Sequence, residues 1–551
     1  MKRVMLGAAL AAMFGGVATV ALAAQAVPAA PAFDVPLMKG IVQTLSSDAY
    51  EGRGPSTPVE PKVLDYIVAR MKAVGLKPGG EKGGWLQTVP TVELTATQHT
   101  PLTVGAHSFA YGSDYVSVSF REVPQTRIDQ ADLVFVGYGI NAPELGWNDY
   151  AGTDMHGKVA VILVNDPDYA QESEEGLFKG RRMTYYGRWT YKFEEAARQG
   201  AKAALIIHDT FPAAYGWNVV QSSWSGPQYR VATPDHGMGE TEADGWISQQ
   251  AARTIFADAG QDYAALVAAA GRKGFHAVPL GAKATYGFDT AIRRSVSHNV
   301  VGILPGRGRP GEYVLYSAHW DHLGHCVPEV KGSAGICHGA VDNATGVAAL
   351  MALAKANVAA GPAPRSQVFV ALTLEESGLL GSEYYAQHPL YPLARTVGGV
   401  NMDALLPGGR SHDYAMTGGD KSELTGLFRQ VLAARGLTEG SEDHPERGHY
   451  YRSDHFSLAK RGVPMFDLSR GPDLFEGGKA AGAAASEDYT EHRYHQPSDT
   501  YSASWNWGGI TQDVGMYYTL GRMLATGRDW PNWHQGDEFR AIRDASLKAG
   551  K

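Results

Sequence analysis

An alternation of apolar strands and helical stretches after about Asn299 limits most strongly how this chain can fold. Four apolar segments are expected to be strands: YVLYSAH (313–319), VFVALTLEE (368–376), GGVNMD (398–403) and GVPMFDL (462–468). Between the first two, residues 345–361 are expected to form a helix that ends at Gly361. Continuously apolar strands that alternate with helices indicate a mostly parallel central sheet covered by helices on both faces. The expected fold class is therefore α/β.

A second, smaller α/β unit is expected earlier in the chain. The segments 131–140 and 157–166 are short and apolar, and residues 193–209 have the pattern of a helix followed by a strand. We interpret residues 128–285 as an inserted domain. Helical apolar spacing over 35–53 and 61–80 predicts two helices before it. A length of 551 residues fits two domains and a leader.

The N-terminus has the pattern of a signal peptide. Lys2 and Arg3 precede an uncharged apolar run, and Ala21-Leu22-Ala23 fits an A-x-A cleavage site. A retained membrane anchor is the alternative, although such runs fall short of the ~20 residues that span a bilayer. We expect residues 1–23 to be removed, which leaves a periplasmic or secreted protein without a stable membrane span.

Charge and cysteine content narrow the functions further. The net charge of −8 provides no basic footprint, so no nucleic-acid partner is expected. The only two cysteines, Cys326 and Cys337, lie close together, which in an exported protein favours a disulfide. Metal binding is the lesser alternative, because neither cysteine has a partner at CxxC spacing. The sequence indicates no particular oligomeric state.

Histidine and acidic residues stand at or after the ends of the predicted strands. They are His319, Asp321, Asp342, Glu375, Glu376, Asp403 and, in a later loop beside Tyr494, His495. Ligands of such sheets bind at the carboxyl ends of the strands, so we expect these side chains to meet in one cleft. Imidazole and carboxylate ligands suit zinc, and an open coordination position marks a catalytic site.

The number of candidate ligands favours two metal ions. Two histidines and three carboxylates exceed the needs of one catalytic zinc but suffice for a pair of ions about 3.5–4 Å apart if one carboxylate bridges them. Successive side chains of an extended segment point to opposite sides. Glu376 can therefore bind a metal while Glu375 takes a proton from the water that the metals activate. We expect two zinc ions per chain.

Five motifs, taken in order, resemble those of the di-zinc exopeptidase family. They are His-x-Asp at 319–321, Asp-Asn at 342–343, Glu-Glu at 375–376, Asn-Met-Asp at 401–403 and Tyr-His at 494–495. That family includes secreted bacterial aminopeptidases, glutamate carboxypeptidase and the catalytically inactive transferrin receptor. The resemblance extends from about residue 299 to 525 and implies a zinc exopeptidase fold. Residues 128–285 resemble the protease-associated domain that several members carry.

The chain is expected to divide into five parts, and the resemblance implies a role for each motif residue. The expected parts are a signal peptide (1–23), an N-terminal part of the peptidase domain (33–127), the insert (128–285), the catalytic part (290–530) and a C-terminal tail (531–551). His319 and Asp403 would hold one zinc, Glu376 and His495 the other, and Asp342 would bridge them. A cis peptide bond is implied between Asp342 and Asn343.

Three further residues would take part in the reaction by the same resemblance. The Asp321 carboxylate would accept a hydrogen bond from the His319 ring and orient it. Glu375 would be the general base and would later protonate the leaving amine. The Tyr494 hydroxyl would stabilise the oxyanion. The expected substrates are peptides. The expected reaction is hydrolysis of a peptide bond by a hydroxide that two metals activate.

Some polar residues near these motifs are not assigned to the reaction. His322, His325 and His338 are interpreted as loop or supporting histidines. Arg452, Asp454 and His455 lie in a segment that resembles the family's substrate pocket, and a structural salt bridge is the alternative interpretation for them.

The function expected first is an exported zinc aminopeptidase. The alternatives are a carboxypeptidase of the glutamate-releasing kind, which needs a basic patch for the substrate's terminal carboxylate, a glutaminyl cyclase with one zinc, and a non-catalytic receptor-like protein. The intact set of five ligands argues against the last two.

Overall fold

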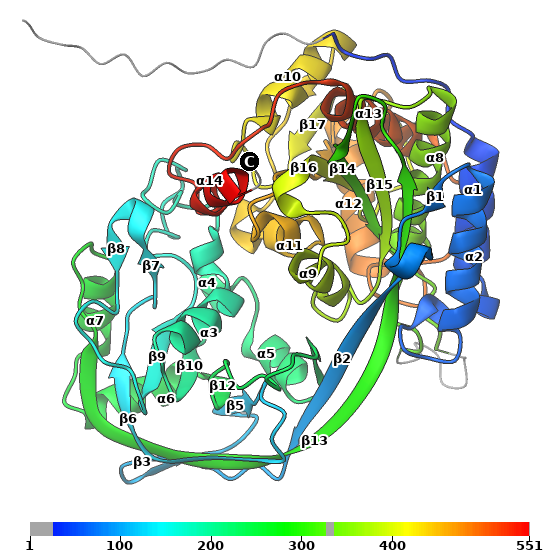
Figure 1. Ribbon diagram of the computed structural model, residues 1–551. Helices are drawn as coiled ribbons and strands as arrows, with labels where there is room; N and C mark the ends of the chain where they lie inside the picture. The colour runs from blue at the N-terminus through cyan, green and yellow to red at the C-terminus, as the bar shows by residue number, and fades with distance from the viewer. Residues whose placement is uncertain (1–25, 327–334, 550–551) are drawn as a thin grey trace, which may run out of the picture.

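The computed structural model describes residues 26–326 and 335–549. The predicted signal peptide lies outside the described residues. Within the described ranges no helix combines the length and the apolar character needed to cross a bilayer. The chain forms two lobes that face each other, one built around α8 and α13 and the other around β9 and β10 (Figure 1).

The first lobe contains the predicted parallel strands. β14 (Arg309–His319) lies between β15 (Arg365–Leu372) and β16 (Thr396–Asn401), and β16 also pairs with β19 (Met465–Phe466). All three pairings are parallel. The predicted sheet is therefore confirmed, but the strand that was expected to reach Glu376 ends at Leu372.

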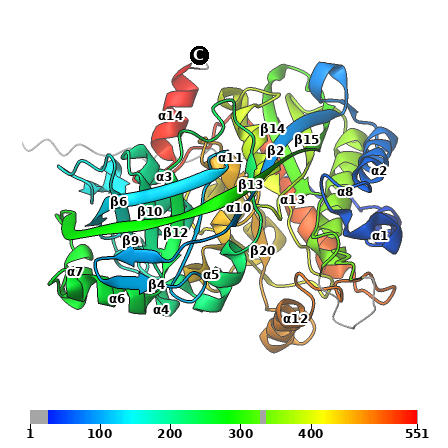
Figure 2. The same ribbon diagram turned by 90° about the horizontal axis from the view of Figure 1, so that it is seen from below.

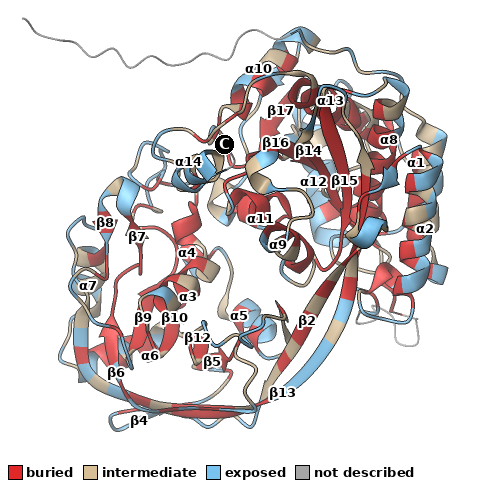
Figure 3. Cartoon of the chain, viewed as in Figure 1, coloured by how far each residue is buried: buried red, intermediate tan, exposed pale blue. Residues whose placement is uncertain are grey.

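Helices cover both faces of this sheet, as the continuous apolar strands predict. Val314 and Tyr316 of β14 pack in a core with α1 (Val35–Leu45), α8 (Gly346–Ala359) and α13 (Gly508–Thr526). Leu315, between them, packs in the opposite core with α9 (Leu380–Gln387) and α11 (His455–Ala459). This alternation follows from the period of two in a strand. Figure 3 shows β14 and β15 buried between the two layers.

The two N-terminal helices are present. α1 is capped by Asp34, whose carboxylate accepts a 2.9 Å hydrogen bond from the backbone N–H of Leu37. A 3-10 turn, Asp48–Arg53, and α2 (Glu60–Ala73) follow it. The turn ends at Arg53, whose side chain is fully buried.

The second lobe has its own sheet and its own cores. β6 (Gln125–Phe135), β9 (Val159–Leu163), β10 (Ala203–Ile207) and β12 (Ala243–Ile247) are parallel neighbours, and β5 (Tyr115–Val118) closes the edge antiparallel to β12. α6 (Gln249–Asp258) packs in one core, and α3 (Trp189–Arg198) and α5 (Trp217–Trp224) contribute to the other.

One long strand belongs to both lobes. The first half of β13 (Val278–Leu304) pairs with β6, and its last residues pair with β15. β2 (Leu86–Thr97) runs antiparallel to it from the Asp289–Thr97 pair to the Val300–Leu86 pair. Figure 2 shows β13 as the bridge along the molecule. The expected domain boundary at 285–290 lies inside this strand, and the boundaries themselves stay a prediction.

The remaining elements complete the two lobes. The strands are β1 (Lys77–Pro78), β3 (Leu102–Val104), β4 (His107–Phe109), β7 (Asn141–Ala142), β8 (Trp147–Asn148), β11 (Gln228–Val231), β17 (Asp413–Met416), β18 (Thr438–Glu439) and β20 (Leu468–Arg470). The helices are α4 (Thr210–Ala213), α7 (Tyr263–Ala270), α10 (Leu424–Arg435), α12 (Gly478–His492) and α14 (Arg540–Ala549).

Candidate metal centre

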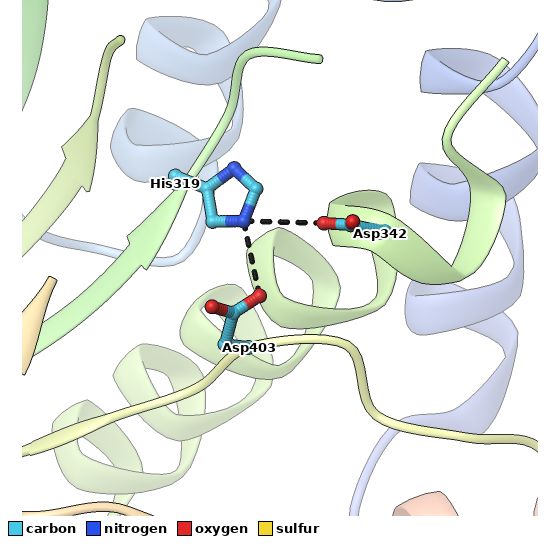
Figure 4. A group of neighbouring side chains, drawn as sticks. All are labelled: His319, Asp342 and Asp403. Atoms are coloured by element: carbon cyan, nitrogen blue, oxygen red, sulfur yellow. Dashed lines mark hydrogen bonds and ion pairs between the residues drawn. The ribbon is translucent and has the colours of Figure 1, made fainter. Parts of the chain in front are cut away.

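The first half of the candidate site forms where β14 ends. The ring Nε2 of His319 lies 3.3 Å from Oδ1 of Asp342 and 3.0 Å from Oδ1 of Asp403. His319 ends β14, Asp342 precedes α8, and Asp403 follows β16. Figure 4 shows both carboxylates pointing at the same ring nitrogen. These three residues could hold one metal ion.

The second half shares Asp342 with the first. The ring Nε2 of His495 lies 3.3 Å from Oδ2 of Asp342 and 3.1 Å from Oε2 of Glu376. One oxygen of Asp342 thus faces His319 and the other faces His495. All five residues that were predicted as ligands come together, in the relative positions expected of a bridging carboxylate between two ions.

A third imidazole, which the sequence interpretation left aside, belongs to this cluster. The ring Nδ1 of His322 lies 2.7 Å from Oε1 of Glu376, and the side chain is fully buried. His322, Asp342 and Glu376 form a second group that could hold an ion. The signal was present in the sequence, because His319 and His322 share the run HWDH. His322 thus either holds the Glu376 carboxylate in position or is itself a candidate ligand of the second ion.

The two adjacent glutamates diverge for a reason other than the one expected. They lie in a bend after β15 and not in an extended strand, and Leu374 before them has a φ of 57°, in the left-handed region. Glu376 meets His322 and His495, whereas Oε2 of Glu375 lies 4.0 Å from Nε2 of His319. The backbone bend separates the two carboxylates.

Asp321 acts mainly on this bend and less on the His319 ring. Its carboxylate accepts hydrogen bonds from the backbone N–H of Glu375 at 3.2 Å and of Glu376 at 3.4 Å. The His319 ring Nδ1 lies 3.2 Å from the Asp321 carbonyl oxygen and 3.7 Å from its carboxylate. The expectation that the carboxylate orients the ring is corrected, because the carbonyl is the nearer acceptor.

A chain of buried hydroxyl and amide groups positions Asp403. Its Oδ2 accepts a 2.6 Å hydrogen bond from the Ser453 hydroxyl, which in turn accepts one of 2.8 Å from the Asn401 side-chain amide. The Asn401 carbonyl oxygen accepts a 2.7 Å hydrogen bond from the Ser317 hydroxyl. Such partners fix the direction of a metal-binding carboxylate.

Asp342 is held from the backbone side. Its peptide bond to Asn343 is cis, as the resemblance implied. The Asp499 carboxylate accepts hydrogen bonds from the backbone N–H groups of Val341 and Asp342 at 3.0–3.1 Å. The segment before Asp342 is also tied to Arg53 through backbone carbonyls.

The buried side chain of Arg53 joins several backbone segments beside the site. Its guanidinium donates to the carbonyl oxygens of Leu45, Trp320, His338, Gly339 and Asp342. Burial lowers its pKa to about 10, although the nearby Asp499 and Asp342 carboxylates oppose this shift. The guanidinium therefore stays charged at neutral pH and offsets part of the negative charge beside it.

The charge of the cluster fits bound cations. Five carboxyl groups, those of Asp321, Asp342, Glu375, Glu376 and Asp403, surround three imidazoles. The Nε2 atom of His495 is buried near two carboxylates yet forms no well-aligned hydrogen bond. A ring nitrogen in this setting suits a metal bond, and imidazole with carboxylate is a zinc-type donor set.

Burial also affects the carboxyl groups beside the ligands. Burial raises the pKa of Glu375 well above its usual value, and the nearby Asp403 and Glu376 raise it further against the effect of His319. Burial raises the pKa of Asp321 to about 7. Burial therefore favours the protonated form of both carboxyl groups.

The loop that carries His495 is fixed from two sides. The Tyr494 ring stacks on the His495 ring with centroids 3.9 Å apart, and Tyr494 is 36% exposed. The predicted disulfide between Cys326 and Cys337 is present, and the Cys337 sulfur lies 3.7 Å from the His495 carbonyl oxygen. The disulfide therefore borders the Glu376 half of the site.

The residues left unassigned lie around the cluster. His338 contacts Asp48, with 2.8 Å between Nε2 and Oδ1, and His325 lies 3.8 Å from Glu51. Asp454 is fully buried, and burial raises its pKa to about 7. His455 lies 3.2 Å from Asp467, and burial lowers its pKa to about 3. These residues surround the site without joining the two groups of ligands.

Comparisons with known proteins give the following. Residues 299–517 match the model of peptidase family M28. The aminopeptidase NAALADL1 of Mus musculus is 29% identical over 131 residues, which are 23% of this chain and 16% of that protein. The chain therefore spans about a sixth of the length of this curated relative.

Solved structures with similar chains include three from bacteria. An aminopeptidase from Aneurinibacillus sp. strain AM-1 has a TM-score of 0.48 at 21% identity and covers 90% of this chain and 95% of its own. BSAP, a zinc aminopeptidase from Bacillus subtilis, has a TM-score of 0.40 at 17% identity, with 91% and 96% covered. A peptidase M28 precursor from Shewanella amazonensis SB2B has a TM-score of 0.40 at 16% identity, with 90% and 94% covered.

Proposed function

On the premise that residues 299–517 are a peptidase family M28 region, we propose that this chain is an exported zinc aminopeptidase that removes N-terminal residues from peptides. The observation that carries the proposal is the position of Asp342, with one carboxylate oxygen 3.3 Å from His319 and the other 3.3 Å from His495. A carboxylate shared in this way is what a pair of ions requires.

Each ion would have its own protein ligands. His319 and Asp403 would hold one zinc, Glu376 and His495 the other, and Asp342 would join them. Two ions bound there would lower the pKa of a water toward ~7 and polarise the scissile carbonyl. Asp321 would keep the Glu375–Glu376 bend in place through its two backbone hydrogen bonds.

Glu375 would move the protons of the reaction. Its raised pKa lets the carboxyl group take a proton from the attacking water and return it to the leaving amine. His322 would hold Glu376 in position through the 2.7 Å contact with Oε1. The Tyr494 hydroxyl, at the open side of the site, would donate a hydrogen bond to the developing oxyanion.

A carboxypeptidase of the glutamate-releasing kind is the second candidate. It is favoured by Arg452, whose charge opposes the rise in the Tyr494 pKa that burial causes and which directly precedes Ser453 in the chain. A guanidinium in that place could receive a substrate carboxylate. A glutaminyl cyclase or a receptor-like protein has no comparable support, because five candidate ligands are in place.

Substrate panels with a chelator test the proposal. Aminoacyl p-nitroanilides and peptides should be hydrolysed, their N-acetylated forms should not, and a chelator should abolish the activity until zinc is restored. Metal analysis should find two zinc ions per chain. Release of C-terminal residues from N-blocked peptides would favour the carboxypeptidase, and activity that resists chelation would contradict both.

Export is part of the proposal. The Cys326–Cys337 disulfide suits an oxidising compartment, and the leader over residues 1–23 supports secretion. Expression of the full chain, followed by cell fractionation and N-terminal sequencing, should find a mature protein that starts near Ala24 outside the cytoplasm.

A further inference from the structure

The C-terminal segment, residues 527–549, contacts both lobes. Figure 1 shows this segment, in red, passing from α13 of the first lobe toward the second lobe. Phe539 is 2% exposed, and its ring centroid lies 6.1 Å from that of Tyr185 in the second lobe and 6.3 Å from that of Phe456 in the first. The Tyr451 ring packs against those of Tyr185 and Phe456. An aromatic cluster therefore joins the C-terminal segment to both lobes.

Glu538 of this segment is a buried carboxylate with partners in both lobes. Its Oε1 accepts hydrogen bonds from the Tyr451 hydroxyl at 3.3 Å and from Lys421 Nζ at 2.8 Å. The Glu538 side chain is 9% exposed. Burial opposes the ionised form, but the charge of Lys421 and the backbone N–H groups of Glu538 and Tyr185 lower the pKa of Glu538 on balance. Glu538 therefore connects three parts of the chain as a charged group.

The charges of this contact are balanced within the protein. Lys421 Nζ lies 2.9 Å from Oδ2 of Asp537 as well as next to Glu538, and it stands over the Tyr450 ring, 5.6 Å from the centroid. Buried carboxylates that are paired with a cation and with hydrogen-bond donors need no external ligand. The contact is therefore a joint within the protein, and its effect must come from the residues that it fixes.

Tyr451 connects this joint to the candidate metal centre. Only Arg452 separates Tyr451 from Ser453, whose hydroxyl donates the 2.6 Å hydrogen bond to Asp403. Tyr451 ends a 3-10 turn, and α11 begins two residues after Ser453. Because a turn and a helix flank Ser453 this closely, a displacement of Tyr451 would also displace the Ser453 hydroxyl. The direction of the Asp403 carboxylate then depends on the joint.

We propose that Glu538 is a positioning residue of the candidate metal centre. Through the Tyr451 hydroxyl it fixes Ser453, and Ser453 directs Asp403 toward the ion that Asp403 and His319 would hold. The inference rests on the proposed two-zinc site and makes the C-terminal segment part of its support, although Glu538 lies outside the family match at 299–517. Loss of the contact should weaken one of the two ions and leave the other in place.

Tyr451→Phe tests the contact, because it removes the hydroxyl and keeps the ring in the cluster. The metal-free protein is titrated with zinc against a competing fluorescent chelator. One of the two sites should be weakened about 3 to 10 times, and the other should stay within about twofold of the wild type. Tyr414→Phe is the matched control, because Tyr414 is also buried and its hydroxyl donates a 2.6 Å hydrogen bond to Asp513. Equal zinc affinities in the two variants would overturn the inference.

Further variants test whether the effect passes through Ser453. In a Ser453→Ala background, Tyr451→Phe should change zinc affinity by less than about twofold, because the link to Asp403 is already broken. Glu538→Ala should weaken the same site as Tyr451→Phe does. Glu538→Gln, which keeps an acceptor oxygen for the Tyr451 hydroxyl, should lie between Glu538→Ala and the wild type. A full effect of Tyr451→Phe in the Ser453→Ala background would overturn the inference.

Hydrogen exchange of the metal-free protein separates this inference from the proposed function. The backbone amides of residues 402–405 and 452–456 should exchange faster in Tyr451→Phe than in the wild type, and Tyr414→Phe should leave them unchanged. If the wild type binds no zinc but shows this pattern, the proposed function fails and the positioning role stands. If the wild type binds two zinc ions and hydrolyses peptides, while neither exchange nor zinc affinity responds to Tyr451→Phe, the positioning role fails and the function stands.

Discussion

The Ser453 hydroxyl donates a 2.6 Å hydrogen bond to Oδ2 of Asp403, whose other oxygen lies 3.0 Å from His319 Nε2. Ser453→Ala should therefore free the Asp403 carboxylate to rotate and should weaken metal binding about 10- to 100-fold. Titration of the metal-free protein with zinc, followed by activity, measures the change. Ser457→Ala is the control, since Ser457 is buried in the same segment but bonds to Ser382. Equal zinc affinity in both variants would contradict the role of Ser453.

Glu375→Gln should lower kcat by about 100- to 10,000-fold, because the amide cannot accept the proton of the attacking water. Zinc content should not change, since Glu375 is not among the proposed ligands. Steady-state kinetics and metal analysis of the same sample test both statements. Glu383→Gln on α9, where Glu383 accepts a hydrogen bond from Gln387, should keep full activity. Loss of zinc in Glu375→Gln would indicate that Glu375 is a metal ligand and not the general base.

Arg53→Met should lower the free energy of unfolding by more than about 3 kcal/mol, because buried carbonyl oxygens lose their donor. The affected carbonyls include those of Trp320 and Gly339, near His319 and Asp342. Denaturant unfolding measures the loss. Arg293→Met is the control, because Arg293 is 73% exposed in its ion pair with Glu93 and should change stability by less than about 1 kcal/mol. Similar losses in both would argue against a structural role for Arg53.

Asp244→Asn should stabilise the protein at alkaline pH and much less at acidic pH. Burial raises the pKa of Asp244 in the folded state to about 7, and its Oδ1 accepts a 2.6 Å hydrogen bond from Thr241. The folded state then binds the proton more tightly than the unfolded chain, so stability is full below about pH 4 and falls as the pH rises to 7. The loss amounts to at most about 4 kcal/mol.

Melting temperatures of wild type and Asp244→Asn at pH 5 and pH 8 test this. The gap between the two proteins should be wide at pH 8 and narrow at pH 5. A constant gap for Asp244→Asn would mean that its carboxyl group titrates normally in the folded protein.

Sequence patterns predicted the part of the molecule that depends on local periodicity and on ends of strands. The continuous apolar strands led to a parallel sheet, and the rule that ligands lie at the carboxyl ends of strands brought His319, Asp342, Glu376, Asp403 and His495 into one place. The closeness of the two cysteines in the chain was sufficient to predict their disulfide.

Other features depend on contacts between distant parts of the chain, which no local pattern encodes. Arg53 reaches the carbonyl of Trp320, which is 267 residues away, and Ser453 lies 50 residues from Asp403. The Asp321 carboxylate accepts hydrogen bonds from the bend that separates Glu375 from Glu376. The two glutamate side chains point apart, as expected, but the cause is this bend and not the alternation of an extended strand.

Because β13 is 27 residues long and belongs to both lobes, neither lobe can be separated from the other without cutting this strand. Dividing the chain at residue 285 or 290 would cut β13 and leave each fragment with an unpaired sheet edge. Such an edge promotes aggregation. The two lobes should unfold together in a calorimeter, and neither lobe should fold well when it is produced alone.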